Sequence, residues 1–250
     1  MLTKKQIKLV RSLEQKKNRK REGLFVAEGP KVVGDLLRGG FRPYAIYSTL
    51  PRPDAQLITD EELHKLSFLQ HPQEVIAVFE IPHSSLLTPH TSLPTPHSSL
   101  SIALDGIQDP GNLGTIIRIA DWFGIDTIYC SEDTADVYNP KVVQATMGSL
   151  AHINIIYTDL VELLQNAHCP VYGTLLDGED IYHQELASEG IIVMGNEGNG
   201  ISQKVRPLIT HRLLIPNFNK NKETAESLNV AIATAITLSE FRRSQRHATN

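Results

Sequence analysis

The second half of the chain alternates short apolar runs with segments whose apolar residues recur at helical spacing. The runs predict buried strands, and the segments between them predict helices that cover the strands. We expect strands at 102–104, 127–129, 153–156, 171–175, 191–194 and 212–215, and helices at 113–123, 141–147, 160–167 and 227–243. This order is typical of an α/β fold with a mostly parallel sheet buried on both faces. Ligands of such sheets bind in the loops at the carboxyl ends of the strands.

Residues 1–81 carry a smaller alternation of the same kind. Helices are predicted at 3–16, 31–37 and 60–66, and strands at 24–27, 44–47 and 75–79. Pro30 suits the first position of the second helix, and Gly39 and Gly40 suit its end. A small α/β domain is therefore expected before the larger one.

Residues 82–100 differ in composition from both neighbours. Pro, His, Ser, Thr and Leu dominate, in a degenerate seven-residue repeat that begins at Pro82, Pro89 and Pro96. Prolines and small polar residues oppose helices and central strands, so a linker is predicted. Its three histidines could bind a metal, but nothing fixes their geometry, and a low-complexity spacer explains them better. The expected division is thus 1–81, 82–100 and 101–250.

Composition places the protein in the cytoplasm. No apolar run is long enough to cross a bilayer, and no secretory signal follows the Lys-rich start. Cys130 and Cys169 lie outside any CxxC, which favours small buried residues in a reducing compartment over a disulfide or zinc site. No membrane partner is expected.

The net charge of −4 does not indicate nucleic-acid binding, but the distribution of charge along the chain is more consistent with it. Nine cations fall near the start, against Glu14 and Glu22: Lys4, Lys5, Lys8, Arg11, Lys16, Lys17, Arg19, Lys20 and Arg21. Such a basic N-terminal arm could follow a phosphate backbone through counterion release. A solvated helix face is the alternative, and charge alone does not decide between them.

The first loop of interest follows the strand at 102–104. Its Pro-Gly pair makes a turn, and Asn112 can cap the next helix through its side-chain oxygen. Arg118, two turns into that helix, could bind a phosphate bidentately. A pair between Arg118 and Asp121 is the simpler explanation from spacing alone.

Two further loops stand out. Residues 195–200 read Gly-Asn-Glu-Gly-Asn-Gly, which fits neither the dinucleotide fingerprint nor the P-loop, and Glu197 could be a solvated turn residue. The third loop ends in Ser227, a reasonable N-cap, and Asn229, a weak helix former. The helix after it is apolar over more than one face, which indicates burial against both the sheet and a partner surface.

Taken together and in order, these loops are distinctive. The segments LDGIQDPGNLGTIIRIADWFG, IIVMGNEGNGIS and LLIPN…ESLNVAIATA resemble the three motifs of the SpoU (TrmH-like) RNA 2′-O-methyltransferases of the SPOUT superfamily. The resemblance covers roughly residues 102–243. The segment KNRKREGLFVAEGPKVVGDLL also resembles the L30e-like substrate-binding domain of many members that act on rRNA.

The resemblance implies a trefoil-knotted C-terminal fold, a homodimer and methyl transfer from S-adenosyl-L-methionine to a ribose 2′-hydroxyl, without a metal. By motif position it implies catalytic roles for Asn112, Arg118, Glu197, Ser227 and Asn229, and cofactor contacts at Gly195, Ile215 and Leu228. Many members have a short link with glycine between the IP pair and the SLN triplet, whereas here residues 217–226 form a longer, polar link without glycine.

Arg118 is the residue that the resemblance offers for the hydroxyl proton. A guanidinium is essentially always protonated, so a plain general-base role is awkward. Either a nearby phosphate helps it to lose a proton, or Arg118 stays charged and stabilises the developing alkoxide. The N-terminal extension favours rRNA over tRNA as substrate, and no DNA partner is expected. A catalytically inactive RNA-binding module is the alternative, against which the intact motif residues argue.

Overall fold

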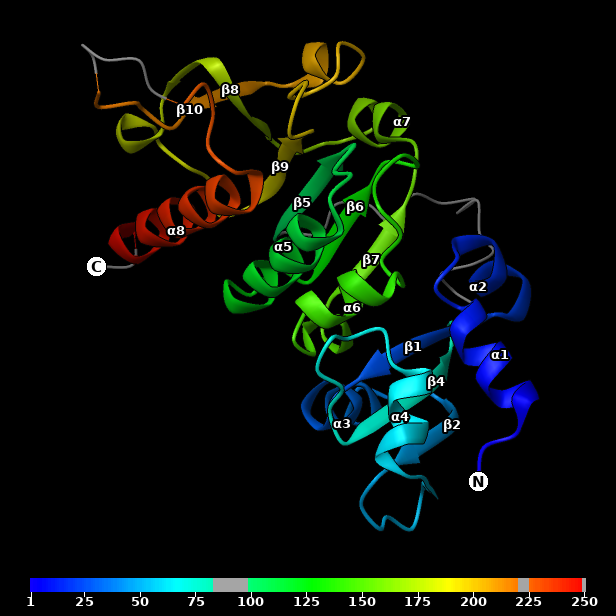
Figure 1. The fold of residues 1–250 in the computed structure, drawn as a ribbon. Helices are drawn as coiled ribbons and strands as arrows, with labels where there is room; N and C mark the ends of the chain where they lie inside the picture. Colours follow the sequence, from blue (N-terminus) through cyan, green and yellow to red (C-terminus); the bar gives the residue numbers. More distant parts are fainter. Residues whose placement is uncertain (83–98, 220–224, 249–250) are drawn as a thin grey trace. The chain divides into compact units, whose positions relative to one another are not determined.

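The computed structural model describes residues 1–82, 99–219 and 225–248 (Figure 1). Contacts divide the described chain into two compact units. The first comprises residues 1–82 and 136–152, and the second comprises residues 99–135 and 153–248. Most of the expected linker, residues 83–98, lies outside the described residues.

The second unit is built on a six-stranded sheet in the order β10-β8-β9-β5-β6-β7, in which every pairing is parallel. Its strands are β5 (Leu100–Asp105), β6 (Thr127–Cys130), β7 (Asn154–Tyr157), β8 (Val171–Asp180), β9 (Gly190–Gly195) and β10 (His211–Leu214). The central strands β5 and β9 are apolar because both of their faces are covered. The predicted parallel sheet is confirmed.

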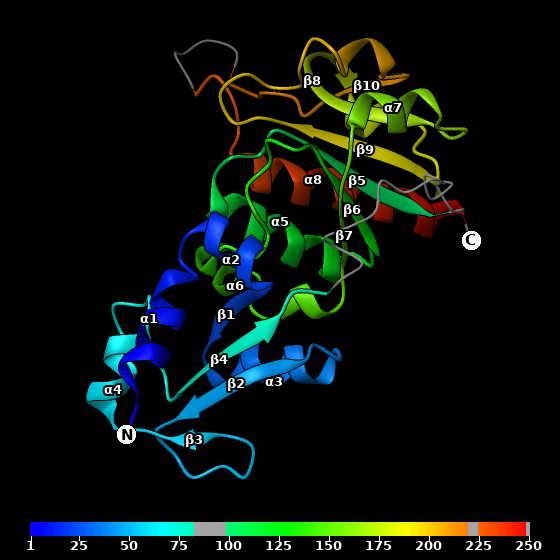
Figure 2. The same ribbon diagram turned by 90° about the vertical axis from the view of Figure 1, so that its right-hand side faces the viewer.

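Helices cover both faces of this sheet. They are α5 (Pro110–Trp122), α7 (Leu160–Gln165) and α8 (Val230–Ala248), with short 3-10 turns η3 (Ile181–His183) and η4 (Arg206–Leu208). The side of β9 that carries Ile191 and Val193 packs against α7. Because side chains alternate along a strand, Ile192 and Met194 face the opposite side. There α5 packs against α8, and α8 against β9, so α7 and α8 lie on opposite sides of β9 (Figures 1 and 2).

The first unit has a four-stranded sheet in the order β1-β4-β2-β3, with β4 antiparallel to both of its neighbours. Its strands are β1 (Leu24–Glu28), β2 (Pro43–Ser48), β3 (Gln56–Leu57) and β4 (Val75–Glu80), and its N-terminal helices are α1 (Lys4–Ser12), α2 (Lys16–Glu22), α3 (Pro30–Arg38) and α4 (Asp60–Leu66). One core joins α1 and α4 to the sheet face that carries Leu24 and Val26. Helix α3 packs against β1 and β4 as well. The small α/β domain expected from the sequence is present.

The segment 136–152, expected in the second domain, packs with the first unit. It contains α6 (Pro140–Ala145) and the turn η2 (Ser149–Ala151). The ring centroid of its Tyr138 lies 4.8 Å from the ring centroid of Phe25. The Phe25 ring in turn stacks on the Phe79 ring, with a centroid distance of 5.6 Å. Phe25 alternates with Leu24 and Val26 along β1, so this aromatic cluster covers the opposite face of the sheet. The first unit therefore needs a piece of chain that follows β6 in the sequence.

The predicted basic arm is folded into α1 and α2, and one of its cations faces inward. The side chain of Arg19 is 2% exposed and meets Asp136 at 2.6 Å from Nη2. Its Nη1 donates to the carbonyls of Leu13 at 2.8 Å and Glu14 at 2.7 Å, at the end of α1. Arg19 thus ties α2 to α1 and to the segment 136–152, and it does not belong to a solvated cationic face.

Glu28, at the end of β1, is a buried carboxylate with two hydrogen-bond donors. It accepts the Ser67 hydroxyl and, at 2.8 Å, the Phe68 amide. Burial raises the pKa of Glu28, because desolvation outweighs these hydrogen bonds. The carboxylate thereby holds the turn that follows α4.

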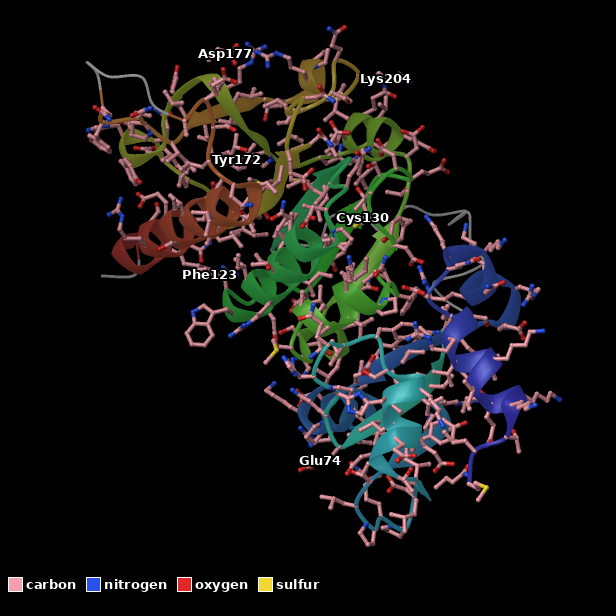
Figure 3. All side chains as sticks on the ribbon, in the orientation of Figure 1. Glu74, Phe123, Cys130, Tyr172, Asp177 and Lys204 are labelled. Atoms are coloured by element: carbon pink, nitrogen blue, oxygen red, sulfur yellow. The ribbon has the colours of Figure 1, made fainter. Side chains whose placement is uncertain are left out.

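Cys130 is fully buried at the end of β6 (Figure 3), and burial raises the pKa of its thiol well above the usual range. This agrees with its interpretation as a small core residue. Within the described residues, no helix is long and apolar enough to span a membrane.

Candidate active site

The loops after β5 and β9 begin side by side at the carboxyl edge of the second unit's sheet. The two strands pair in parallel, and their last residues, Asp105 and Gly195, are partners in the register. The loop after β5 leads into α5, and the loop after β9 carries Glu197. Parallel pairing therefore brings the first and second motifs together, as expected for a ligand site at this edge.

Glu197 joins these two motifs directly. Its carboxylate accepts Nδ2 of Asn112 at 3.0 Å, and the backbone amides of Gln108 and Asp109 at 3.3 Å each. Glu197 is therefore more than a solvated turn residue, because its carboxylate bridges the two loops. All three donors come from the loop after β5 or the first turn of α5.

Asn229 adds the third motif. Its Nδ2 donates to Oδ1 of Asn112 at 2.9 Å, while its own Oδ1 accepts the amides of Ala231 at 3.0 Å and Ile232 at 3.3 Å. The hydrogen bonds run in one direction, from the start of α8 through Asn229 and Asn112 to Glu197. Each amide side chain therefore has its oxygen and nitrogen assigned by its neighbours.

Both predicted helix caps are wrong by a few residues. Asp109, not Asn112, caps α5, because its side chain accepts the Asn112 amide at 2.8 Å. Asn229, not Ser227, caps α8, which begins at Val230. With Asp109 as the cap, the Asn112 side chain is free to link Glu197 and Asn229. Asn229 precedes the helix, so its poor helix propensity does not destabilise α8.

Gly195 is required by a close approach of backbone. A Cβ atom there would lie 2.2 Å from the carbonyl carbon of Gly200 and 2.3 Å from the nitrogen of Ile201. Asn196 and Gly200 exchange two backbone hydrogen bonds of 2.9 Å, and Gly200 has φ +67°. The loop 195–200 is thus a closed turn that folds back over the end of β9.

Arg118 lies elsewhere on α5. It is exposed, on the helical stripe that also carries Gly111, Thr115 and the 85% exposed Trp122. The structure gives Arg118 no hydrogen bond or ion pair with any described residue, so the simpler pairing with Asp121 is not formed. Arg118 is not joined to the Asn112–Glu197 pair either, since six positions along a helix place the two side chains on different faces.

The remaining predicted residues surround the loops without joining the network of Glu197, Asn112 and Asn229. Ser227 and Leu228 are exposed, Leu228 to 51%, just before Asn229. Ile215 is partly buried directly after β10. Among the described residues, no hydrogen bond connects these side chains to the network.

Asn196 was not among the residues predicted for the site. Its Nδ2 donates to the carbonyl of Gly106 at 2.6 Å, and its Oδ1 accepts the amides of Gly198 at 2.9 Å and Asn199 at 3.0 Å. An Asn that begins a glycine-rich turn is a signal for such side-chain to backbone bonding, and it could have been recognised. Over the described ranges, no cluster of His, Cys, Asp and Glu suited to a metal is found.

Comparison with known families decides the class of protein. The family model described as SpoU rRNA Methylase family matches residues 99–239, and an MRM3-like substrate binding domain matches residues 4–77. The chain belongs to the SpoU rRNA methylase family. Its sequence-based assignment to SpoU, with the enzyme class and S-adenosylmethionine as cofactor, is confirmed.

Relatives of this SpoU protein match over nearly its whole length. The 23S rRNA (guanosine(2553)-2′-O)-methyltransferase RlmP of Bacillus subtilis is 30% identical, over 93% of this chain and 94% of its own. The structure of an AdoMet-bound rRNA methyltransferase from Sinorhizobium meliloti has a TM-score of 0.83 at 32% identity, covering 97% of this chain and 96% of its own. A TrmH-family structure from Porphyromonas gingivalis has a TM-score of 0.81 at 40% identity, covering 97% and 99%.

Proposed function

We propose that this SpoU-family protein transfers a methyl group from S-adenosylmethionine to a ribose 2′-hydroxyl of ribosomal RNA, with the residues of the three motifs as its active site. The observation that carries the proposal is the hydrogen-bonded set of Glu197, Asn112 and Asn229, one residue from each motif. Ribosomal RNA is favoured over tRNA because the Bacillus subtilis relative is named for 23S rRNA. The match to a substrate binding domain in residues 4–77 supports the same choice.

The cofactor supplies an activated methyl group, so the protein has to orient the acceptor and stabilise charge. Arg118 is exposed and without a partner among the described residues, so its guanidinium is available to the RNA. It remains protonated and stabilises the negative charge that develops on the 2′-oxygen as the hydroxyl proton passes to water. A planar guanidinium also suits the adjacent phosphate.

Asn112, Glu197 and Asn229 form the rigid part of the site. Their mutual hydrogen bonds fix the start of α5 relative to the start of α8 and to the loop after β9. Ser227, exposed two residues before Asn229, contributes a hydroxyl for the substrate. The role of this group is to hold the RNA so that the 2′-oxygen lies in line with the methyl carbon.

Gly195, Ile215 and Leu228 would hold the cofactor. The apolar side chains of Ile215 and Leu228 are partly or largely uncovered in the loops around β10 and α8. Uncovered apolar surface beside a tight glycine turn suits a purine ring, and neither position carries a charge that would need a partner. This chain's residues therefore fit S-adenosylmethionine.

The protein acts as a cytoplasmic homodimer whose C-terminal region carries the trefoil knot of its family. Ile232, 53% exposed in the first turn of α8, is apolar surface that a second copy would cover. Arg118, which does not reach Glu197 within its own chain, would then serve a site completed across the interface. The first unit, with its exposed lysines on α1 and α2, delivers the RNA.

The activity is tested by Arg118→Ala in the full chain. We expect loss of methyl transfer by at least about a hundredfold, as for removal of one transition-state donor, with calorimetric cofactor binding unchanged. Arg52→Ala is the matched control, since Arg52 is a partly exposed arginine paired with Asp54. Near wild-type turnover by Arg118→Ala contradicts the assignment. Mapping 2′-O-methyl sites with and without the gene then decides between rRNA and tRNA.

The dimer is tested with Ile232→Glu. Light scattering of the wild-type chain at micromolar concentration should give twice the monomer mass, and the charged variant should shift it toward the monomer. Because Ile232 is half exposed, its substitution should leave the fold of each chain intact, and the unfolding temperature should fall only by the part that dimerisation contributes. A wild-type monomer would remove the shared site from the proposal.

A further inference from the structure

The side chain of Asn196 makes three hydrogen bonds that hold the loop presenting Glu197. Its oxygen faces two backbone N–H groups, of Gly198 and Asn199, and its nitrogen faces the Gly106 carbonyl at 2.6 Å. The reverse orientation of the amide would leave every one of these contacts unsatisfied. Its backbone also closes the turn with Gly200. One residue therefore shapes the turn and attaches it to the end of β5.

The other end of this loop is held by the neighbouring residue of β5. The amide of Ser202 donates to Oδ2 of Asp105 at 2.7 Å, and Asp105 is only 8% exposed. The consecutive residues Asp105 and Gly106 thus anchor both ends of the segment 196–202. Gly106 has φ +73°, a conformation that glycine adopts without strain and that directs the chain toward Gln108.

Glu197 sits between these two anchors, and its own contacts are not short. Two of its hydrogen bonds, to the amides of Gln108 and Asp109, are 3.3 Å long, near the upper limit for N–H···O bonds. The residue is also exposed, so water competes for its carboxylate. Its placement therefore depends on the loop that carries it. The shortest contact between that loop and the first motif is the one from Asn196 to Gly106.

We propose that Asn196 is a positioning residue for methyl transfer: its amide sets the place of the Glu197 carboxylate, and through it the orientation of Asn112 and Asn229. This inference rests on the proposed role of Glu197. Replacement of Asn196 by Asp, which has nearly the same shape, removes the N–H donor to the Gly106 carbonyl. It keeps an oxygen that accepts the amides of Gly198 and Asn199.

The test is Asn196→Asp in the full chain, with Asn199→Asp as its matched control. Both place the same new charge in the same loop. The side chain of Asn199 makes no hydrogen bond with any described residue, whereas a carboxylate at 196 loses the donor to Gly106 and faces its carbonyl. Thermal unfolding and cofactor binding, measured for both, verify that each variant folds.

At pH 8 we expect kcat for methyl transfer to fall about tenfold to a hundredfold for Asn196→Asp, with KM for RNA nearly constant, and Asn199→Asp to stay near wild type. A protonated carboxyl at 196 can again donate to the Gly106 carbonyl. The ratio of the Asn196→Asp rate to the wild-type rate should therefore rise as pH is lowered, while the ratio for Asn199→Asp stays flat. A loss caused by misfolding would instead lower thermal stability and cofactor binding together with kcat.

Wild-type kcat for Asn196→Asp, or a loss that does not change with pH, would overturn the inference. Glu197→Gln separates this result from failure of the proposed active site. Full activity of Glu197→Gln removes the site assignment and with it the reason for positioning. Impaired Glu197→Gln beside normal Asn196→Asp removes the role of Asn196 alone.

Discussion

Asn229 donates a hydrogen bond from Nδ2 to Oδ1 of Asn112, 2.9 Å away, across 117 positions of sequence. The same Asn229 caps α8 through its side-chain oxygen. One short side chain therefore starts the C-terminal helix and attaches that start to the first turn of α5. Asn229 therefore contributes both to the stability of the fold, as a helix cap, and to the geometry of the site, through Asn112. Two substitutions separate these contributions.

Asn229→Ser should keep the cap and lose the contact with Asn112, since serine is a good N-cap but is too short to span the same distance. We expect unfolding close to wild type and a methylation rate reduced by about tenfold or more. Asn229→Ala loses both functions and should also lower the free energy of unfolding by about 1 kcal/mol. Urea unfolding and single-turnover methylation measure the two effects. A fully active serine variant would show that the link to Asn112 is dispensable.

Gly195→Ala should disrupt the loop that carries Glu197. The added Cβ would meet Gly200 at 2.2 Å, so the backbone of the turn must move. We expect cofactor affinity to fall by at least about tenfold, because the loop that borders the proposed site is displaced. Gly198→Ala is the control, since a Cβ there meets only Oδ1 of Asn196, at an ordinary 3.6 Å. Equal calorimetric affinities for the two variants would argue against a cofactor contact at Gly195.

Exposed lysines on α2 should contribute the salt dependence of RNA binding. Replacing Lys16, Lys17 and Lys20 by Gln removes three solvated cations, and each phosphate contact contributes a slope of about 0.7 in log affinity against log salt for a single strand. We expect weaker RNA binding, a slope lower by up to about 2, and unchanged cofactor affinity. Arg52→Gln, which removes a cation already paired with Asp54, should leave the slope unaltered. A slope that survives the triple substitution would place the RNA on another surface.

The Arg19–Asp136 bridge should respond unequally to loss of its two partners. Asp136→Ala leaves a guanidinium that is 2% exposed without its anion, whereas Arg19→Met leaves a carboxylate that is 16% exposed. Breaking a buried pair costs about 3–5 kcal/mol, and we expect Asp136→Ala to approach this value and Arg19→Met to cost less. The double variant should be more stable than Asp136→Ala alone. Urea unfolding of the four proteins measures the coupling, and additive losses would contradict it.

Glu28 should make the first unit less stable as pH rises. Its raised pKa means that the folded state binds a proton more tightly than the unfolded state does. The corresponding stability is fully present below the ordinary pKa of a glutamate and is lost as pH rises through the raised value. Glu28→Gln cannot ionise, so the wild type should lose stability relative to this variant across that window. Unfolding midpoints of both proteins, followed from acid to neutral pH, measure the sign.

Patterns that depend on burial were readable from the sequence. The apolar runs at β5 and β9 predicted their strands because both faces of a central parallel strand are covered. Helix α2 was not predicted, since the expected helix ended at residue 16 and the sequence KKNRKRE has no apolar position to mark a face. Its one buried cation, Arg19, is indistinguishable in the sequence from the lysines around it, because its partner Asp136 is 117 positions away.

The site was predicted to the level of its loops and not to that of its contacts. Asp109 and Asn112 both suit an N-cap, and only the structure shows that the first of them takes it. Which amide faces Glu197 depends on the pairing of β5 with β9, a long-range register that local propensity does not contain. Asn196 is visible as a turn residue, but its bond to Gly106 follows from the same register.

The first unit is discontinuous in sequence, which limits how the chain can be divided into fragments that fold independently. A cut between residues 82 and 99 would separate residues 1–82 from Tyr138 and the rest of segment 136–152, which would stay with the other fragment. The aromatic face at Phe25 would then lie open to water. Recombination at the linker, in the laboratory or in evolution, would therefore have to carry two pieces of chain.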